Sequence, residues 1–492
     1  MGLKFVSTRG DKKEYSASEA VIRGLADDGG LYVPVSVPKL DIPVSELTGK
    51  SYREVAFEVL KLFFDDYTKE ELKECIDKAY DSKFDTDAIA PLVHHGDRYF
   101  LELFHGPTIA FKDMALSILP HLLTTALRKN NIDDKIIIMT ATSGDTGKAA
   151  LEAFADVEGT KIIVFYPKGG VSNIQERQMV TQKGANTKVV GVNGNFDDCQ
   201  TQVKKMFSDP ELNSELASKG YRFSSANSIN IGRLFPQVAY YVYSYVKMVE
   251  NNAINDGDPL DFVVPTGNFG NILAAYYAKR IGIPVGRLVC ASNENKVLYD
   301  FFETGEYDRN REFILTSSPS MDILISSNLE RLIYHSLGDD AAANARLMSD
   351  LAKCGKYAVG SDIRQKMSDF TGIYATEDEV FDTIKSIYEE CGYVIDTHTA
   401  VAAFADGKYK KDPGRKSVVI STASPYKFLG NVLRAIDTKL VSTDDFEMAD
   451  TLSKVSNVPI PPAIRNIKDA KILHDAVCNV EEMKNVLRGY LR

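Results

Sequence analysis

Short runs of β-branched and apolar residues, each followed by a helix-length segment, constrain the fold of this chain more than any other feature. They occupy residues 135–140, 161–166, 187–192, 261–265, 287–291 and 417–422. Strands of this kind with helical segments between them are typical of βαβ units and of parallel sheets buried on both faces. We therefore predict an α/β protein. Because ligands bind beyond the carboxyl ends of such strands, the loops after them are the first candidates for a site.

The first 95 residues differ in pattern and are expected to form a separate, mostly helical unit. Ser16 and Glu19 have the spacing of a capping box, and residues 52–80 carry helical periodicity. The whole pattern predicts a helical N-terminal domain (1–95), a large α/β domain (96–130 and 235–440, with a polar insertion at about 293–375), a small α/β domain (131–234) and a C-terminal extension (441–492).

The composition limits the classes of partner. The chain has 492 residues and a formal net charge of −10, which argues against bulk binding to nucleic acid or to an anionic membrane surface. The six cysteines are scattered without a Cys-x-x-Cys pair, so we expect neither a disulfide framework nor a metal site. The sequence has no apolar leader and no apolar run of membrane-spanning length, and a cytoplasmic location is the expectation.

Lys112 is the first candidate for a reactive group. It follows Ile109 and Phe111 in the stretch 104–113, a poor environment for a solvated charge. A desolvated lysine has a lowered pKa and acts as a nucleophilic amine. Taken alone, this pattern more often means that the lysine stem covers apolar surface, so the assignment depends on the other loops.

Three loops that follow predicted strands carry small and polar residues. Thr266–Asn271 contains two glycines and precedes an apolar helix at 272–280, so its backbone N–H groups and the helix dipole suit a phosphate. Thr142–Thr146 places hydroxyls and free amides at a helix start and suits a carboxylate or phosphate. Thr422, at the carboxyl end of an apolar strand, can bond a heteroaromatic nitrogen.

Asn230 and Arg233 add a fourth candidate segment, because arginine suits bidentate recognition of a phosphate. Each of these features has an ordinary structural explanation when it stands alone: a turn, a helix cap or a surface salt bridge. Together they supply a buried amine, a phosphate site, a hydroxyl for a ring nitrogen and a loop for a carboxylate. Those are the requirements of a pyridoxal-phosphate enzyme that acts on an amino acid.

Six motifs also resemble a known family. They are Phe-His-Gly-Pro-Thr…Phe-Lys-Asp (104–113), Thr-Ser-Gly-Asp-Thr-Gly (142–147), Gly-Asn-Phe-Gly-Asn (267–271), Ser-Thr-Ala-Ser-Pro (421–425), Ala-Asp-Asp-Gly-Gly-Leu-Tyr-Val-Pro (26–34) and Ser-Pro-Ser-Met-Asp (318–322). Their order over nearly the whole chain is similar to that of threonine synthases of the longer bacterial and fungal type. The resemblance implies a fold-type-II pyridoxal-phosphate enzyme, of the tryptophan synthase β-like kind, that converts O-phospho-L-homoserine and water to L-threonine and phosphate.

The resemblance also implies roles for individual residues. Lys112 would hold the cofactor covalently, and Thr422 would face its pyridine nitrogen. The cofactor phosphate would be bound by Gly267, Asn268, Phe269, Gly270 and Asn271. The substrate would be bound by Thr142, Ser143, Gly144, Asp145, Thr146, Asn230 and Arg233. Ser424 departs from the pattern, because many relatives have histidine there.

Other classes of protein stay open at this point. A serine/threonine dehydratase, or a lyase that makes 2-oxobutyrate from phosphohomoserine, would share Lys112 and the phosphate loop. A non-catalytic ligand sensor would keep the pocket without the chemistry. A nucleotide-binding kinase is disfavoured, because the loop 266–271 has no Walker lysine. We expect a small-molecule substrate and a monomer or homodimer.

Overall fold

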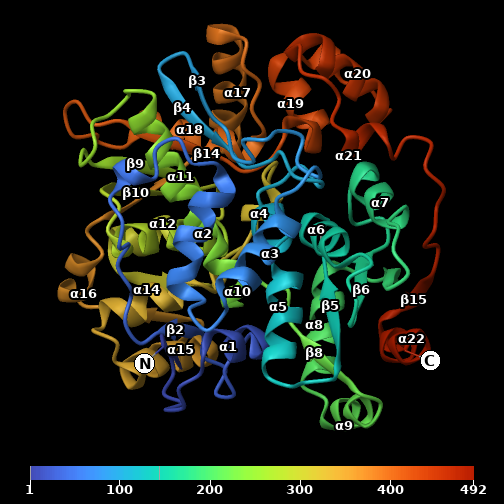
Figure 1. Cartoon of the computed structure of the whole chain (residues 1–492). Helices are drawn as coiled ribbons and strands as arrows, with labels where there is room; N and C mark the ends of the chain where they lie inside the picture. Colours follow the sequence, from blue (N-terminus) through green and yellow to red (C-terminus); the bar gives the residue numbers. More distant parts are fainter. Residues whose placement is uncertain (1, 143, 492) are drawn as a thin grey trace.

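Two parallel sheets form the framework of the protein, which is described here as a computed structural model covering residues 2–142 and 144–491 (Figure 1). The smaller sheet has five strands in the order β15-β7-β6-β5-β8, and all its neighbours are parallel. Its strands are β5 (Lys135–Ala141), β6 (Thr160–Pro167), β7 (Thr187–Asn193), β8 (Tyr221–Ser224) and β15 (Val477–Asn479).

The larger sheet has six strands in the order β13-β10-β9-β14-β4-β3, of which only β3 and β4 pair antiparallel. Its strands are β3 (Leu92–His95), β4 (Arg98–Glu102), β9 (Leu260–Pro265), β10 (Val285–Ser292), β13 (Phe370–Tyr374) and β14 (Ser417–Ser421). All six strands predicted from the sequence are present, with ends within two residues of the prediction. The α/β prediction is therefore confirmed.

Both sheets are covered by helices on both faces, which is why their strands read as continuous apolar runs. On the small sheet, Ile136 and Ile162 join the main core, whereas Ile137 and Ile163 face a separate cluster on the opposite side. This sheet contacts α6 (Asp145–Phe154) and α8 (Phe196–Phe207). The large sheet contacts α12 (Gly270–Ile281) and α18 (Thr397–Lys408).

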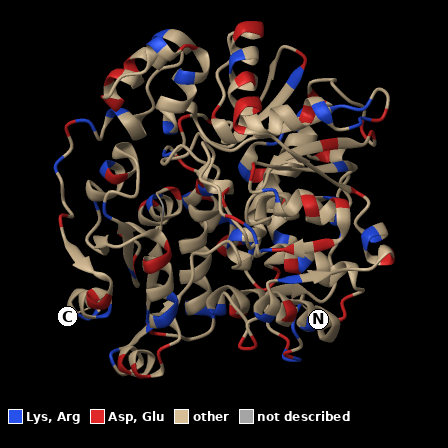
Figure 2. Cartoon of the chain, turned by 180° about the vertical axis from the view of Figure 1, so that it is seen from behind, with Lys and Arg blue, Asp and Glu red and all other residues tan. Residues whose placement is uncertain are grey.

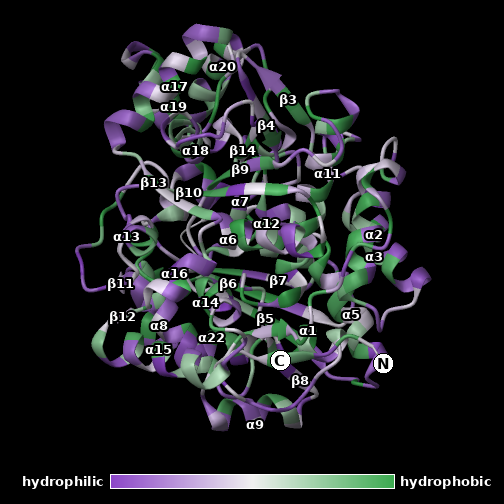
Figure 3. Cartoon of the chain, turned by 90° about the vertical axis from the view of Figure 1, so that its left-hand side faces the viewer, coloured by the Kyte–Doolittle hydropathy of each residue, from purple (hydrophilic) through white to green (hydrophobic). Residues whose placement is uncertain are grey.

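The N-terminal unit is mostly helical and adds a two-stranded antiparallel sheet. It contains β1 (Phe5–Ser7), α1 (Ala17–Arg23), β2 (Tyr32–Pro34), a 3-10 turn at Val44–Glu46, α2 (Tyr52–Phe63) and α3 (Lys69–Ala79). The predicted capping box is present, since the Ser16 hydroxyl accepts from Glu19 N at 3.3 Å and the Glu19 carboxylate accepts from Ser16 N at 2.7 Å. Both α2 and α3 carry hydrophobic and hydrophilic residues along their length, as expected of helices with one buried face (Figure 3).

The other elements connect these parts. The helices are α4 (Lys112–Leu116), α5 (Leu119–Lys129), α7 (Asn173–Val180), α9 (Pro210–Ser218), α10 (Ile231–Leu234), α11 (Pro236–Glu250), α13 (Val297–Thr304), α14 (Leu329–Ser336), α15 (Ala341–Cys354), α16 (Ser361–Lys366), α17 (Glu377–Cys391), α19 (Leu429–Ile436), α20 (Asp445–Ser456), α21 (Pro462–Arg465) and α22 (Met483–Tyr490). β11 (Glu306–Asp308) and β12 (Lys356–Ala358) pair antiparallel. The segment 293–375, expected to be a polar insertion, contributes β13 to the edge of the large sheet.

The C-terminal segment runs along the outside of the molecule. It leaves α20 and α21 beside the large sheet and descends to β15 and α22 beside the small one (Figure 1). Lys and Arg are interspersed with Asp and Glu over the outer helices, as solvated faces require (Figure 2). Within residues 2–142 and 144–491, no helix combines the length and the apolar character needed to cross a bilayer.

Candidate active site

Lys112 is the first residue of α4, and this short helix lies near the centre of the molecule between the two sheets (Figure 1). The backbone before it is paired with the segment that follows β14. Phe111 N donates to the Thr422 carbonyl at 2.8 Å, and Ser424 N donates to the Ile109 carbonyl at 3.0 Å. This pairing holds Lys112 next to Thr422, although the two residues are 310 positions apart in the sequence.

The Lys112 ammonium group is enclosed by polar side chains in an otherwise buried position. Its Nζ donates to Ser320 Oγ at 3.2 Å and lies 3.7 Å from Asp145 Oδ2, and the side chain is 12% exposed. Burial lowers the pKa of Lys112, the nearby Asp145 carboxylate opposes that shift, and the positive charges of Lys427 and Arg233 add to it. A lysine with a lowered pKa holds more of its amine form near neutral pH, which is the nucleophilic and basic form.

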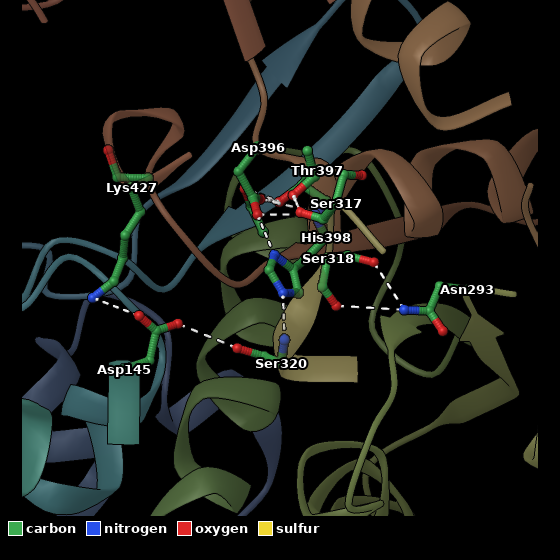
Figure 4. A network of polar contacts seen from close by, with 12 residues as sticks. Asp145, Asn293, Ser317, Ser318, Ser320, Asp396, Thr397, His398 and Lys427 are labelled. Atoms are coloured by element: carbon green, nitrogen blue, oxygen red, sulfur yellow. Dashed lines mark hydrogen bonds and ion pairs between the residues drawn. The ribbon is translucent and has the colours of Figure 1, made fainter. Parts of the chain in front are cut away.

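Asp145, the first residue of α6, connects Lys427 to Ser320 in the polar network (Figure 4). Its carboxylate is 3.0 Å from Lys427 Nζ and accepts from Gln175 Nε2 at 3.1 Å and from Ser320 Oγ at 3.2 Å. Burial raises the pKa of Asp145, but the charges of Lys427 and Lys112 outweigh burial and hold it far below its usual range. Asp145 therefore stays ionised and keeps one oxygen directed at Ser320 and Lys112.

The loop before α6 is built around the side chain of Thr142. Its hydroxyl oxygen accepts from Gly144 N at 3.0 Å and from Gly147 N at 2.9 Å. Gly144 has a φ of 136°, in the region that favours glycine. Thr146 is half-buried in the same loop, and Ser143 lies outside the described residues. Asp145 belongs to this loop and brings it close to Lys112. Binding of the substrate by the loop stays a prediction.

The loop between β9 and α12 has the geometry of an anion site. Among residues 2–142 and 144–491, the backbone N–H groups of residues 267–271 find no hydrogen-bond acceptor. Phe269 adopts a left-handed φ of 64° at the N-terminal end of α12 and directs the chain into the helix. Free N–H groups at a helix N-terminus suit a phosphate. These residues therefore fit the phosphate of a cofactor bound at Lys112.

Gly267 brings this loop against the residues around Lys112. A Cβ at Gly267 would lie 2.7 Å from the carbonyl oxygen of Ser320, so a larger residue would separate the two segments. Asn271 is also near the loop's base: its Oδ1 accepts from the hydroxyls of Tyr240 and Tyr241, at 2.6 Å each. Its buried Nδ2 has no partner among the described residues, so one further donor is available in this part of the site. Asn268 is exposed at the outer edge.

Asn230 and Arg233 differ in what their side chains contact. Asn230 is fully buried and caps α10, with Oδ1 accepting from Gly232 N at 2.9 Å and Nδ2 donating to the Val21 carbonyl at 3.0 Å. Both ends of this amide are thus engaged within the protein. Arg233 is buried, donates to the Ala226 carbonyl at 2.7 Å and leaves Nε without a described partner. Burial lowers its pKa to about 10, and this buried cation suits an incoming anion.

Four residues in the network were not among the sequence candidates. Ser320 contacts both Lys112 and Asp145, and its backbone N donates to His398 Nε2 at 3.1 Å. His398 Nδ1 lies 2.8 Å from Asp396 Oδ2, and Lys427 pairs with Asp145. Ser320 belongs to the 318–322 motif, which supported the family resemblance but indicated no role for this residue. His398 and Lys427 have no local signal, because the fold alone brings them to Asp145 and Ser320.

Comparisons with known proteins agree with this geometry. Two protein-family models match the chain: "Pyridoxal-phosphate dependent enzyme" over residues 91–423 and "Threonine synthase N terminus" over residues 4–80. A crystal structure of pyridoxal-phosphate-bound threonine synthase from Brucella melitensis is similar, with a TM-score of 0.89 and 35% identity, and the match covers 100% of both chains. Threonine synthase of Schizosaccharomyces pombe is 37% identical over 478 residues, which cover 90% of each chain.

A third relative is longer than this chain. Threonine synthase-like 1 of Macaca fascicularis is 39% identical over 489 residues, and the match covers 96% of this chain but 65% of that protein. Fold and matches together assign the chain to the family of pyridoxal-phosphate-dependent enzymes of fold type II. Within that class, the N-terminal match and the relatives of similar length identify the family. The chain belongs to the threonine synthase family.

Proposed function

We propose that the protein is a threonine synthase that uses pyridoxal phosphate to convert O-phospho-L-homoserine and water to L-threonine and phosphate. One observation carries the proposal: Ser320 contacts both Lys112, a lysine with a lowered pKa, and Gly267, in a loop whose backbone N–H groups find no acceptor among the described residues. The family membership of the chain supports the choice of reaction.

The cofactor-binding residues in this proposal are the sequence candidates. Lys112 would hold the cofactor through its Nζ, residues 267–271 would bind the cofactor phosphate through backbone N–H groups, and Thr422 would offer its hydroxyl to the ring nitrogen. Bound pyridoxal phosphate supplies an electron sink for negative charge that develops on the substrate carbons. The backbone pairing of 109–111 with 422–424 supports this arrangement, because it fixes the distance between Lys112 and Thr422.

Lys112 also moves the proton at the substrate Cα. When free, the Lys112 amine would accept the proton from the substrate Cα and later return a proton to the same carbon. The lowered pKa supports this role, because a group that both takes and gives a proton works best with a pKa close to the working pH. Asp145 stays ionised and holds the Lys112 amine in place through Ser320.

The substrate carries a carboxylate and a phosphate, and two candidate sites have matching chemistry. We assign the carboxylate to the loop 142–146 at the start of α6, where a helix N-terminus favours an anion. Arg233 is the candidate for the substrate phosphate, supported by its burial without a described carboxylate partner. Asn230 then acts by capping α10, and through that helix it positions Arg233.

Incubation of the purified protein with O-phospho-L-homoserine tests the proposal. Threonine and phosphate should appear in equal amounts, and Lys112→Ala should abolish both products and the visible absorbance of the bound cofactor. Lys410→Ala, which changes an exposed lysine, is the matched control. A 2-oxo acid with ammonia in place of threonine would show a lyase of the other kind, and an unchanged spectrum in Lys112→Ala would remove Lys112 from the site.

The proposal also includes the location of the protein in the cell, its partners and its oligomeric state. We expect a cytoplasmic location, a small-molecule substrate without nucleic-acid or membrane partners, and a monomer or homodimer. The net charge of −10 supports the exclusion of bulk anionic partners. Size-exclusion chromatography with light scattering measures the oligomeric state, and a tetramer or larger assembly would contradict that part.

A further inference from the structure

We propose that Ser320 is a further catalytic residue, which aims the amine of Lys112, and that His398 with Asp396 positions Ser320 for this role. The proposal rests on the function assigned to Lys112 above. The residues come from three separate parts of the chain: α4, the 3-10 turn at Pro319–Met321, and the N-terminal end of α18.

The hydroxyl of Ser320 has a fixed direction because both of its neighbours are fixed. Ser320 Oγ donates to Asp145 Oδ2 at 3.2 Å, and Asp145 is ionised, so it can only accept. The Ser320 hydroxyl proton is therefore directed at Asp145, and its lone pairs are left for another donor. Lys112 Nζ, 3.2 Å away, is that donor. With one N–H bonded to Ser320, the Lys112 amine has a defined orientation for its own lone pair.

Asp145 itself cannot turn away from Ser320. Its other oxygen, Oδ1, is 3.0 Å from the Nζ of Lys427, whose side chain is fully buried, and accepts from Gln175 Nε2 at 3.1 Å. Lys427 Nζ in turn donates to the Thr108 carbonyl at 2.9 Å. Figure 4 shows Lys427, Asp145 and Ser320 in one line of dashed contacts. One carboxylate oxygen is thus reserved for Ser320.

The backbone of Ser320 is held from the opposite side by His398. The Ser320 N–H can only donate, so His398 Nε2, at 3.1 Å, carries no proton. The proton of this neutral imidazole is then on Nδ1, which donates to Asp396 Oδ2 at 2.8 Å. Asp396 is buried and also caps α18. His398 therefore connects a rigid helix end to Ser320 (Figure 4).

The neighbouring contacts leave little freedom for this turn. Thr397 Oγ1 donates to the Ser317 carbonyl at 2.8 Å, and Asn293 Nδ2 donates to Ser318 Oγ at 3.0 Å. On its far side, the Ser320 carbonyl lies against Gly267. A serine bonded at its N–H and its hydroxyl, with its carbonyl packed against a glycine, is suited to orient a reactive amine.

Ser320→Ala tests the role, with Ser320→Thr as the variant that keeps a hydroxyl and Ser386→Ala, at an exposed position of α17, as the control. In Ser320→Ala we expect kcat to fall about 10- to 100-fold, the effect of one hydrogen bond to a charged or reacting group, with KM within about threefold. Cofactor affinity should stay within about twofold, and Ser320→Thr should recover most of the rate. Equal loss in Ser320→Thr, or a fall in cofactor affinity that accounts for the lost rate, would overturn the proposal.

A second readout does not depend on the natural substrate. Exchange of the Cα hydrogen of L-2-aminobutyrate, which has no leaving group, is followed in D₂O by NMR with the holoenzyme. Ser320→Ala should slow this exchange by the same factor as kcat, and exchange at the wild-type rate would overturn the proposal. If the wild type exchanges this amino acid but makes no threonine from phosphohomoserine, the proposed function fails while the role of Ser320 is still measured.

A third readout needs no amino acid at all. The visible absorbance of the holoenzyme reports the link between Lys112 and the cofactor, and the charged groups facing Lys112 are Asp145, Lys427 and Arg233. In Ser320→Ala we expect the pH midpoint of this absorbance to move by about half a unit or more. His398→Ala should produce the same change in the midpoint. His398→Gln keeps an acceptor near the position of Nε2, so its midpoint should be close to that of the wild type. An unchanged midpoint in both Ser320→Ala and His398→Ala would overturn the positioning role.

Discussion

At the scale of single residues, the charges around Lys112 explain how a buried lysine is kept reactive. Asp145 alone would raise the pKa of Lys112 and hold it as an inert ammonium. Lys427 takes one oxygen of Asp145 and adds its own positive charge. Lys112 therefore faces one carboxylate and two other cations, Lys427 and Arg233, and this surplus of positive charge together with burial favours the neutral amine of Lys112.

Lys427→Met should move the pH dependence of kcat/KM to higher pH. The substitution keeps most of the length of the side chain and removes its charge. Because the charge of Lys427 lowers the pKa of Lys112, its loss raises that pKa, and we expect the acid limb of the profile to move up by about one pH unit. The measurement is kcat/KM from pH 5 to 10, with Lys410→Met as the control for an exposed lysine. An acid limb that stays in place or moves to lower pH would contradict this account.

A functional residue can be predicted from the sequence when its neighbours along the chain indicate its role. Lys112 is recognisable from its apolar neighbours, and Asp145 from its position in a small-residue loop after a strand. Ser320 lies 208 positions from Lys112, and only the packing of the 3-10 turn against α4 and α6 brings them together. For the same reason the sequence did not indicate that both polar atoms of the Asn230 amide bond within the protein.

At the scale of elements, the site is made where strand ends and helix starts meet. β5 leads into α6, β9 leads into α12, and β14 leads to Thr422, all at carboxyl ends of parallel strands. Strands are predictable here because burial on both faces selects apolar runs. The point at which one helix ends and the next begins is harder to predict. The periodic segment 52–80 forms two helices, because Thr68 caps α3 with its hydroxyl 3.2 Å from Glu71 N. The signal for that break is a capping box inside a continuous apolar pattern.

Gly147→Ala should disturb α6 and with it Asp145. A Cβ at this position would lie 2.4 Å from Thr142 Cγ2 and 2.9 Å from Val164 Cγ1, both in rigid surroundings. We expect a loss of about 1–3 kcal/mol in the free energy of unfolding and at least a tenfold loss of kcat/KM. Gly407→Ala is the control, since no described atom lies within 4 Å of its added Cβ in α18, and it should keep full activity. A Gly147→Ala enzyme with wild-type activity would show that α6 can shift without moving Asp145.

His105, just after β4, should make stability depend on pH. Burial lowers its pKa, but bonds to Asp85 at 2.6 Å and Glu102 at 2.9 Å outweigh burial and raise the pKa to about 9. Because the folded pKa is above the unfolded value of about 6.5, the stabilisation is complete below pH 6.5 and is lost as pH rises towards 9. The difference corresponds to at most about 3 kcal/mol. Urea unfolding at pH 6 and pH 9 should show the loss in the wild type and in His94→Asn, but not in His105→Asn.

At the scale of the whole molecule, the C-terminal segment joins the two sheets. Arg177 on α7 donates from Nε to the Ile467 carbonyl at 2.6 Å and from Nη2 to the Lys468 carbonyl at 2.7 Å. Beyond these contacts, β15 pairs in parallel with β7. The predicted extension 441–492 thus contributes a strand to the sheet formed mainly by residues 135–224. A strand of three residues, so far along the chain from the strand it pairs with, is too short to be predicted from the sequence. The domain boundaries stay a prediction.

Leu487→Ala should therefore destabilise the small sheet, although the residue is almost at the end of the chain. Leu487 is fully buried in the cluster that contains Ile137 of β5 and Ile163 of β6, so the truncation leaves a cavity against the sheet. Substitutions of this kind cost about 2–5 kcal/mol. Leu473→Ala, at a position that is 47% exposed in the same segment, should change the free energy of unfolding by less than about 0.5 kcal/mol.

Hydrogen exchange followed by mass spectrometry locates the effect of Leu487→Ala. If the C-terminal segment is part of the small unit, amide exchange in β5, β6 and β7 should accelerate, whereas exchange in β9 and β14 of the large sheet should stay at the wild-type rate. Acceleration confined to residues 477–491 would mean that the segment opens by itself and only covers the sheet. In that case α7, which Arg177 ties to the segment, would be held by the small sheet alone, and Gln175 would keep its contact with Asp145 without help from the C-terminus.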